Sequence, residues 1–204
     1  MRLKDKIAII TGSARGIGKA IALRFAREKA KLSLVDINEE GLKLVKKEVE
    51  KEGTVAITIV CNVAKFDEVK RMVRNTLETF GRIDILVNNA GIIRRGSIET
   101  VTEEDWDTVI EVNLKGTFNC SRAVMEIMKE QRYGKIINIS SIAAKLGDIT
   151  SAPGYGPSKA AIDALTKTFA RQLAKYGINV NAVSPHAIET DMSAQWSEEK
   201  RAVR

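Results

Sequence analysis

The stretch Thr11-Gly12-Ser13-Ala14-Arg15-Gly16-Ile17-Gly18 stands between a short apolar run at 6–11 and a longer amphipathic segment at about 16–28. Glycines between a strand and a helix let the backbone approach a pyrophosphate, and the helix N-terminus adds free N–H groups and positive potential. The spacing is GxxxGxG, not GxGxxG. Because close packing of the helix on the strand would use the same glycines, the turn alone leaves nucleotide binding and simple packing both open.

The rest of the chain repeats this order of strand and helix. Apolar runs typical of strands buried on both faces stand at 6–11, 31–36, 54–60, 83–89, 134–140 and 178–184. Helical patterns lie between them at about 16–28, 38–52, 65–80, 102–131 and 154–176. The alternation predicts an α/β fold, a doubly wound parallel sheet of the Rossmann type with helices on both faces.

Length and composition favour a single domain over residues 1–204, with 44% hydrophobic residues to form its core. No stretch approaches the roughly 18 apolar residues of a membrane span, and the N-terminus runs directly into a strand pattern. We therefore expect a cytoplasmic protein with no membrane partner. Cys61 and Cys120 lie in apolar surroundings without metal-like spacing, which indicates two reduced thiols and no metal site.

The net charge of +7 raises the question of a nucleic-acid partner. The 33 Lys and Arg residues are interleaved with 26 Asp and Glu residues, and no basic run is interleaved with aromatic residues. This pattern is typical of solvated helix faces, so no nucleic-acid partner is expected.

Asp36 closes the second predicted strand. A carboxylate at this place can accept hydrogen bonds from both ribose hydroxyls and repels a 2′-phosphate, which favours NAD over NADP. Arg15 points the other way, because an arginine in the glycine-rich turn could pair with that phosphate, so NADP stays possible. Asp36-Ile37-Asn38 could instead cap the following helix.

Four further motifs follow in order along the chain. They are Asn88-Asn89-Ala90-Gly91 after the fourth strand, Asn113, Ser140-Ser141 after the fifth strand, and Tyr155 with Lys159. Together with TGSARGIG they make the chain resemble the single-domain short-chain dehydrogenase/reductase family from residue 3 to about residue 193. Within that family the sequence is most similar to 3-oxoacyl-carrier-protein reductases and to NAD-linked sugar or polyol dehydrogenases.

The resemblance implies an oxidoreductase that transfers a hydride between a nicotinamide cofactor and a ketone or secondary alcohol, with a small-molecule substrate that could be bound to a carrier protein. It implies catalytic roles for Asn113, Ser141, Tyr155 and Lys159. The cofactor-binding residues that it implies are Gly12, Ser13, Arg15, Gly16, Ile17, Gly18, Asp36, Asn62, Val63, Asn89, Ala90, Gly91, Tyr155, Lys159, Pro185, Ile188 and Thr190. Taken singly, Asn62 could also be a strand-end cap and the segment 88–91 a plain turn.

The pair Tyr155 and Lys159 carries the expected chemistry. A free tyrosine has a pKa near ~10, and an ammonium group one helical turn away stabilises the phenolate and lowers that pKa. By the resemblance, Tyr155 is the general acid in reduction and the base in oxidation, and Lys159 tunes it and holds the cofactor ribose. Ser141 would bond the substrate oxygen, and Asn113 would anchor a water that links Lys159 to solvent. Alone, Asn113 could be a polar helix residue bonded to backbone.

Two departures from the family pattern bear on function. His186 replaces the glycine that usually follows Pro185, so this imidazole contacts substrate, impairs the nicotinamide pocket or faces solvent. By the resemblance, relatives continue beyond ETDM with a substrate lid and a seventh strand. This C-terminally short sequence stops at Arg204, as a genuine short form, a truncated chain or part of a longer one, so six strands are expected. A catalytically silent nucleotide-binding protein is therefore the alternative. Relatives pair through helices around 102–132 and 154–176, which implies a homodimer or homotetramer.

Overall fold

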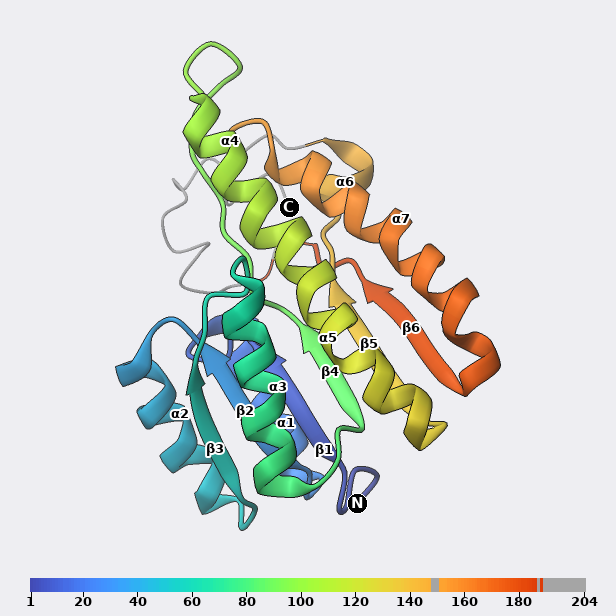
Figure 1. Cartoon of the computed structure of the whole chain (residues 1–204). Helices are drawn as coiled ribbons and strands as arrows, with labels where there is room; N and C mark the ends of the chain where they lie inside the picture. Colours follow the sequence, from blue (N-terminus) through green and yellow to red (C-terminus); the bar gives the residue numbers. More distant parts are fainter. Residues whose placement is uncertain (148–150, 187, 189–204) are drawn as a thin grey trace.

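The computed structural model describes residues 1–147, 151–186 and 188. Its centre is a six-stranded sheet in which every neighbouring pair is parallel, in the order β3-β2-β1-β4-β5-β6 (Figure 1). The strands are β1 (Ile7–Thr11), β2 (Lys31–Asp36), β3 (Ala56–Val60), β4 (Ile85–Asn88), β5 (Gly134–Ile139) and β6 (Ile178–Val183). The strand order reverses between β1 and β4, which places a ligand-binding crevice at their carboxyl ends.

Helices cover both faces of this sheet. Their bounds are α1 (Gly16–Arg27), α2 (Glu39–Lys51), α3 (Phe66–Phe80), α4 (Glu103–Ile110), α5 (Gly116–Gln131), α6 (Ala143–Leu146) and α7 (Tyr155–Leu173). In Figure 1, α3, α5 and α7 lie in front of the sheet, and α1 and α2 lie behind it. The predicted doubly wound α/β fold is confirmed.

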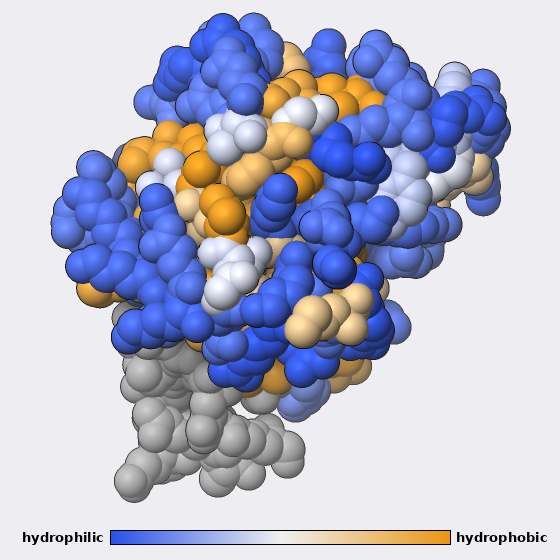
Figure 2. All heavy atoms as spheres, turned by 90° about the horizontal axis from the view of Figure 1, so that it is seen from below, coloured by the Kyte–Doolittle hydropathy of each residue, from blue (hydrophilic) through white to orange (hydrophobic). Residues whose placement is uncertain are grey.

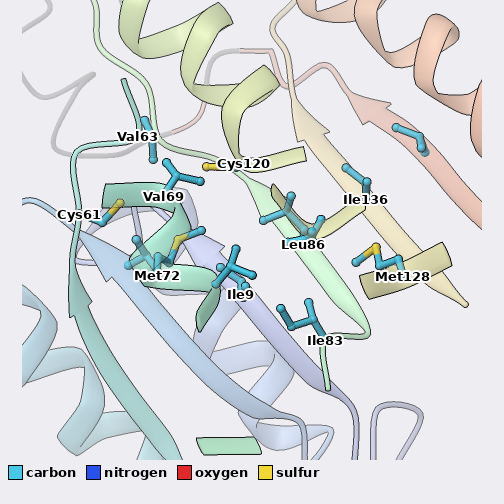
Figure 3. Close-up of a cluster of buried hydrophobic side chains, with 14 of the residues drawn as sticks. Ile9, Cys61, Val63, Val69, Met72, Ile83, Leu86, Cys120, Met128 and Ile136 are labelled. Carbon is cyan, nitrogen blue, oxygen red and sulfur yellow. The ribbon is translucent and has the colours of Figure 1, made fainter. Parts of the chain in front are cut away.

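The alternation of side chains along β1 supplies one apolar layer on each face. Ile9 packs in the cluster under α3, α5 and α7, while Ala8 and Ile10 pack in the cluster under α1 and α2. Figure 3 shows the first cluster, in which the side chains of Met72, Leu86 and other labelled residues meet. All these side chains are buried, so both faces of the central strand are withdrawn from water.

The predicted helix at 102–131 is not a single α-helix, which corrects the sequence-based expectation. Glu111–Lys115 forms a π-helical segment between α4 and α5. The hydroxyl of Thr117 donates to the Asn113 carbonyl oxygen (2.7 Å), and the Asn113 side chain is bonded outside the helix. Gly116 faces Val63 so closely that an added Cβ would stand 2.6 Å from a Val63 methyl. The short helix α6 and a 3₁₀ turn at Ala174–Tyr176 were not predicted either.

The amino edge of the sheet buries a carboxylate. Asp84 is fully buried, accepts the Ile7 N–H (2.9 Å) and is held by both Nε (3.1 Å) and Nη2 (2.6 Å) of Arg82, with Lys6 Nζ at 3.9 Å. Figure 2 views the molecule from this side and shows a mostly hydrophilic surface with hydrophobic areas between the polar residues. Among the described residues, no helix combines the length and apolar content needed to cross a bilayer, and no group of three His, Cys, Asp or Glu side chains could hold a metal.

Candidate active site

A cavity of about 470 Å³ lies at the carboxyl edge of the sheet. It extends from the end of β2, past the glycine-rich turn, to the start of α7. The predicted residues that line it are Gly12, Arg15, Gly16, Ile17, Asp36, Asn62, Val63, Asn89, Ala90, Gly91, Ser141, Tyr155, Lys159, Pro185 and Ile188. One cavity thus brings together residues from turns that are far apart in sequence.

Three of the predicted residues do not line this cavity, and a fourth cannot be placed. Ser13 is buried behind the turn, where its N–H and its hydroxyl both donate to the Val35 carbonyl (3.1 and 3.3 Å). Gly18 lies against the turn itself, since a Cβ there would stand 2.1 Å from the Gly12 carbonyl oxygen. Asn113 is buried beneath the cavity. Thr190 lies outside the described residues.

The first turn of α1 is open toward an anion. The first turn contains no acidic side chain, and Arg15 at the N-cap position makes no capping hydrogen bond with its side chain. By contrast, Asn38 caps α2 by accepting the Gly41 N–H (3.0 Å), and Thr102 caps α4 by accepting the Asp105 N–H (3.1 Å). The N–H groups and positive end of α1 therefore fit the phosphates of a dinucleotide better than those of α2 or α4 do.

The glycine-rich turn is held by the segment after β4. Asn89 Nδ2 donates to the carbonyl oxygens of Thr11 (3.0 Å) and Gly12 (2.9 Å). In return, the Thr11 hydroxyl accepts the N–H groups of Asn89 (3.0 Å) and Ala90 (3.1 Å). Gly12 has a φ of +64°, and an added Cβ would lie 2.8 Å from Ala90 Cα. The glycines thus serve close packing as well as the cavity wall.

Asp36 lies at the far end of the cavity. Its Oδ2 accepts the Ala14 N–H (3.1 Å) and its Oδ1 accepts the Asn38 N–H (3.0 Å). The carboxylate therefore braces the glycine-rich turn, while the capping of α2 falls to Asn38. Each carboxylate oxygen has more than one lone pair, so these bonds leave capacity for a ribose hydroxyl. Nearby, Asn62 Oδ1 accepts the Ala64 N–H (3.0 Å) while the residue also lines the cavity.

Tyr155 and Lys159 occupy the first two turns of α7, with the Lys159 ammonium 5.6 Å from the centre of the Tyr155 ring. Lys159 is only 4% exposed and donates to the Ile139 carbonyl oxygen (2.8 Å). Burial lowers the pKa of Lys159 to about 8, and the carboxylate of Asp163 acts in the opposite direction. Gly91 lies beside the ammonium, since a Cβ there would stand 3.5 Å from Nζ, an ordinary contact distance.

The two serines after β5 have different surroundings. Ser140 is buried, and its hydroxyl donates to the Lys159 carbonyl oxygen (3.2 Å). The Ser141 hydroxyl is half-buried at the cavity and accepts the Ala143 N–H (3.2 Å) from α6. A hydroxyl that accepts one N–H can still donate its own hydrogen, so Ser141 can serve a substrate oxygen.

Asn113 is bonded entirely to its protein surroundings. Its Oδ1 accepts the Ile92 N–H (2.8 Å), and its Nδ2 donates to the Ile92 carbonyl oxygen (3.0 Å) and to the Ser158 hydroxyl (3.1 Å). These contacts match the expectation of a polar side chain bonded to backbone. A role for Asn113 in anchoring a water stays a prediction.

His186 lines the cavity together with Pro185, on the loop after β6. The Pro185 carbonyl oxygen accepts the Ile142 N–H (3.0 Å), which ties this loop to the segment that carries Ser141. The imidazole lines the cavity and is also exposed, so contact with substrate, a narrowed nicotinamide pocket and a solvent-facing position all still apply.

Sequence reasoning gave no site role to several residues that build or line this cavity. Thr11 and Ser158 build it through hydrogen bonds, and the further lining residues are Ala14, Val35, Ile37, Asn38, Cys61, Ile92, Val112 and Ile139. The signal for Thr11 was its position as the last residue of β1, at the ligand-binding edge. Burial raises the pKa of the Cys61 thiol to about 11, which makes it a poor nucleophile.

Comparison with known proteins places this geometry in context. The family described as short chain dehydrogenase matches residues 6–201. The 3-oxoacyl-[acyl-carrier-protein] reductase FabG of Thermotoga maritima is 44% identical over 201 residues, which are 98% of this chain and 81% of that protein. The crystal structure of a 3-oxoacyl-[acyl-carrier protein] reductase from Brucella melitensis matches with a TM-score of 0.93 at 36% identity, over 98% of this chain and 76% of that one. An NAD⁺-bound xylitol dehydrogenase matches with a TM-score of 0.88 at 37% identity, over 91% and 72%.

Proposed function

From the premise that this chain belongs to the short-chain dehydrogenase family and is an oxidoreductase, we propose that it reduces 3-oxoacyl thioesters to 3-hydroxyacyl thioesters. The observation that carries the chemistry is the convergence of Ser141, Tyr155 and Lys159 on one cavity with the glycine-rich turn. The similarity to two 3-oxoacyl-carrier-protein reductases supports the substrate class.

The residues present fit a nicotinamide dinucleotide, the cofactor that supplies or accepts the hydride when it is bound. The uncapped first turn of α1 suits its phosphates, Asp36 suits the adenosine ribose, and Asn62 with Val63 suits the adenine. Asn89, Ala90 and Gly91 continue the cavity wall toward Lys159.

Tyr155 then handles the proton. In reduction its hydroxyl donates a proton to the substrate oxygen, and in oxidation its phenolate takes that proton back. Lys159 keeps its ammonium group beside the ring and favours the phenolate by charge. The Ser141 hydroxyl donates to the substrate oxygen and orients it toward Tyr155.

We propose NAD as the preferred cofactor, because the Asp36 carboxylate at the end of β2 lines the cavity and would repel a 2′-phosphate. Arg15 lines the same cavity and is the residue that would support NADP. A titration of the protein with NADH and with NADPH, followed by fluorescence, separates the two; tighter binding of NADPH would contradict the preference.

The test of the reaction is the loss of NADH and NADPH absorbance with acetoacetyl thioesters, run beside oxidation of xylitol and other polyols with NAD⁺. Faster turnover of the thioesters supports the proposal. Faster turnover of polyols selects the second candidate, a polyol dehydrogenase, which Asp36 and the likeness to xylitol dehydrogenase favour. Cofactor binding without turnover of any panel member would leave the catalytically silent alternative.

Two partners follow from the same proposal. The net charge of +7 suits an acidic carrier protein as the bearer of the substrate, so kcat/KM for the carrier-bound substrate should exceed that for a short thioester and fall with salt.

We also propose a homo-oligomer formed through α5 and α7, where Phe118 of α5 is partly exposed beside Phe169 of α7. Sedimentation as a monomer would contradict the oligomer.

A further inference from the structure

Ser158 lies between two elements of the active site. Its side chain is fully buried, and its hydroxyl donates to the Tyr155 carbonyl oxygen (2.6 Å) while it accepts the Nδ2 hydrogen of Asn113 (3.1 Å). A serine within a helix often bonds back to a carbonyl three or four residues earlier. Here the same hydroxyl oxygen also accepts a hydrogen bond from Asn113 in the π-helical segment. The Ser158 side chain therefore links two helical segments and does more than bond back to its own helix.

Asn113 in turn clamps the loop after β4. Its amide makes two hydrogen bonds to Ile92, one to the N–H and one to the carbonyl oxygen. Both hydrogens of Nδ2 are thereby used, one on Ile92 and one on Ser158. The Ser158 hydroxyl thus accepts the Nδ2 hydrogen of Asn113 that does not bond to Ile92.

This chain of bonds passes beside the reacting groups. It joins the loop after β4, the π-helical segment and the first turn of α7, where Tyr155 stands. An added Cβ on Gly91 would lie 3.2 Å from Asn113 Oδ1 and 3.5 Å from Lys159 Nζ, so the bonded amide and the ammonium are close neighbours. A shift of Asn113 would therefore be felt at both Tyr155 and Lys159.

We propose that Ser158 is a positioning residue that locks Asn113 against Ile92 and fixes the first turn of α7, and with it the phenol of Tyr155. It touches neither substrate nor cofactor in this role. The inference relies on the proposed function only for its kinetic readout, since the bonds themselves belong to the ligand-free protein.

The first test is hydrogen exchange of the Ile92 amide in the ligand-free protein, measured by NMR. Ser158→Ala should speed this exchange about fivefold or more although Ser158 does not touch Ile92, because Asn113 loses one of its anchors. Ser158→Cys keeps the size of the side chain with a weaker hydrogen-bonding group and should lie between the two. Ser33→Ala is the matched control, since it also removes a buried hydroxyl bond (to Thr76, 2.9 Å) but lies outside the site.

The second test is a double-mutant cycle on kcat with Ser158→Ala and Asn113→Ala. Ser158→Ala alone should lower kcat about tenfold with little change in cofactor affinity. If the two residues act as one unit, the double variant loses much less than the product of the single losses, whereas Ser33→Ala combined with Asn113→Ala is multiplicative. Unchanged Ile92 exchange, or multiplicative losses for Ser158 and Asn113, overturns the proposal. If the wild type turns over no substrate, the proposed function fails while the exchange experiment still decides the role of Ser158.

Discussion

Asp84 at the amino edge of the sheet and Lys159 at the carboxyl edge are both buried charges, and their surroundings differ. Asp84 forms ion pairs with Arg82 and Lys6 and accepts a hydrogen bond from the Ile7 N–H. Lys159 has a carbonyl oxygen and an aromatic ring beside it, and no described carboxylate forms an ion pair with it. A buried charge that is paired with opposite charges acts mainly on the stability of the fold. A buried charge without an ion pair can instead shift the pKa of a neighbouring group or attract a ligand. The difference supports the proposal that the chemistry takes place at the carboxyl edge.

The largest effect on turnover is expected at Tyr155, the residue next to the buried Lys159 ammonium. Tyr155→Phe should lower kcat at least about a thousandfold, because the proton donor is gone, while cofactor affinity stays near that of the wild type. Steady-state rates with a 3-oxoacyl thioester and a fluorescence titration with NADH measure the two quantities. A variant that remains active without the phenol oxygen would end the acid–base role of Tyr155.

At the opposite edge, Asp84→Asn should act on stability alone. Removal of the charge leaves Arg82 and the Ile7 N–H poorly matched, so the free energy of unfolding should fall by about 3 kcal/mol. Urea unfolding measures the loss, and NADH affinity of the folded variant serves as the control. A weakened cofactor affinity with unchanged stability would break the contrast between the two edges.

Lys159→Met should have the reverse effect on stability. The lowered pKa means that the native state releases the Lys159 proton near pH 8, while the unfolded chain keeps it to about pH 10.4. Because the unfolded state binds more protons in that interval, wild-type stability rises with pH there.

Below pH 8 the wild type carries the full cost of a buried ammonium. Lys159→Met should therefore be about 2 kcal/mol more stable than the wild type at pH 7, should lose this advantage toward pH 10, and should lose turnover. Urea unfolding at several pH values checks the trend. A destabilised variant at pH 7 would show that the ammonium is a paired, structural charge like Asp84.

The smallest effect is expected at Asp36, which combines both kinds of role. Asp36→Ala should reduce the preference for NADH over NADPH about tenfold, because the carboxylate that repels a 2′-phosphate is removed. It should also loosen the turn through the lost Ala14 bond. Unchanged cofactor kinetics would restrict Asp36 to bracing the turn.

The fold followed from local patterns in the sequence, whereas most of the predicted cavity-lining residues came from the resemblance to the family. Buried strands, amphipathic helices and glycine-rich or asparagine-rich turns at strand ends are signals within a few residues. The π-helical segment and the roles of Thr11 and Ser158 depend on contacts that no local pattern carries. Thr11 accepts the Ala90 N–H across 79 positions, and Asn113 meets Ser158 across 45. His186 was visible as a departure from the family pattern, but its place beside the cavity required the loop after β6.

The position of β1 in the strand order also has a consequence for how the chain assembles. Its second neighbour, β4, becomes available only after α1, β2, α2, β3 and α3 have been made, and the Ile7 N–H meets Asp84 across 77 residues. Closing so long a loop lowers the chain entropy before any native contact forms, so the pairing of β1 with β4 should form late in folding. If β4 slipped by one residue against β1, the buried Asp84 carboxylate would lose its hydrogen bond from the Ile7 N–H. This bond therefore helps to set the register between β1 and β4, the two strands whose carboxyl ends flank the cavity.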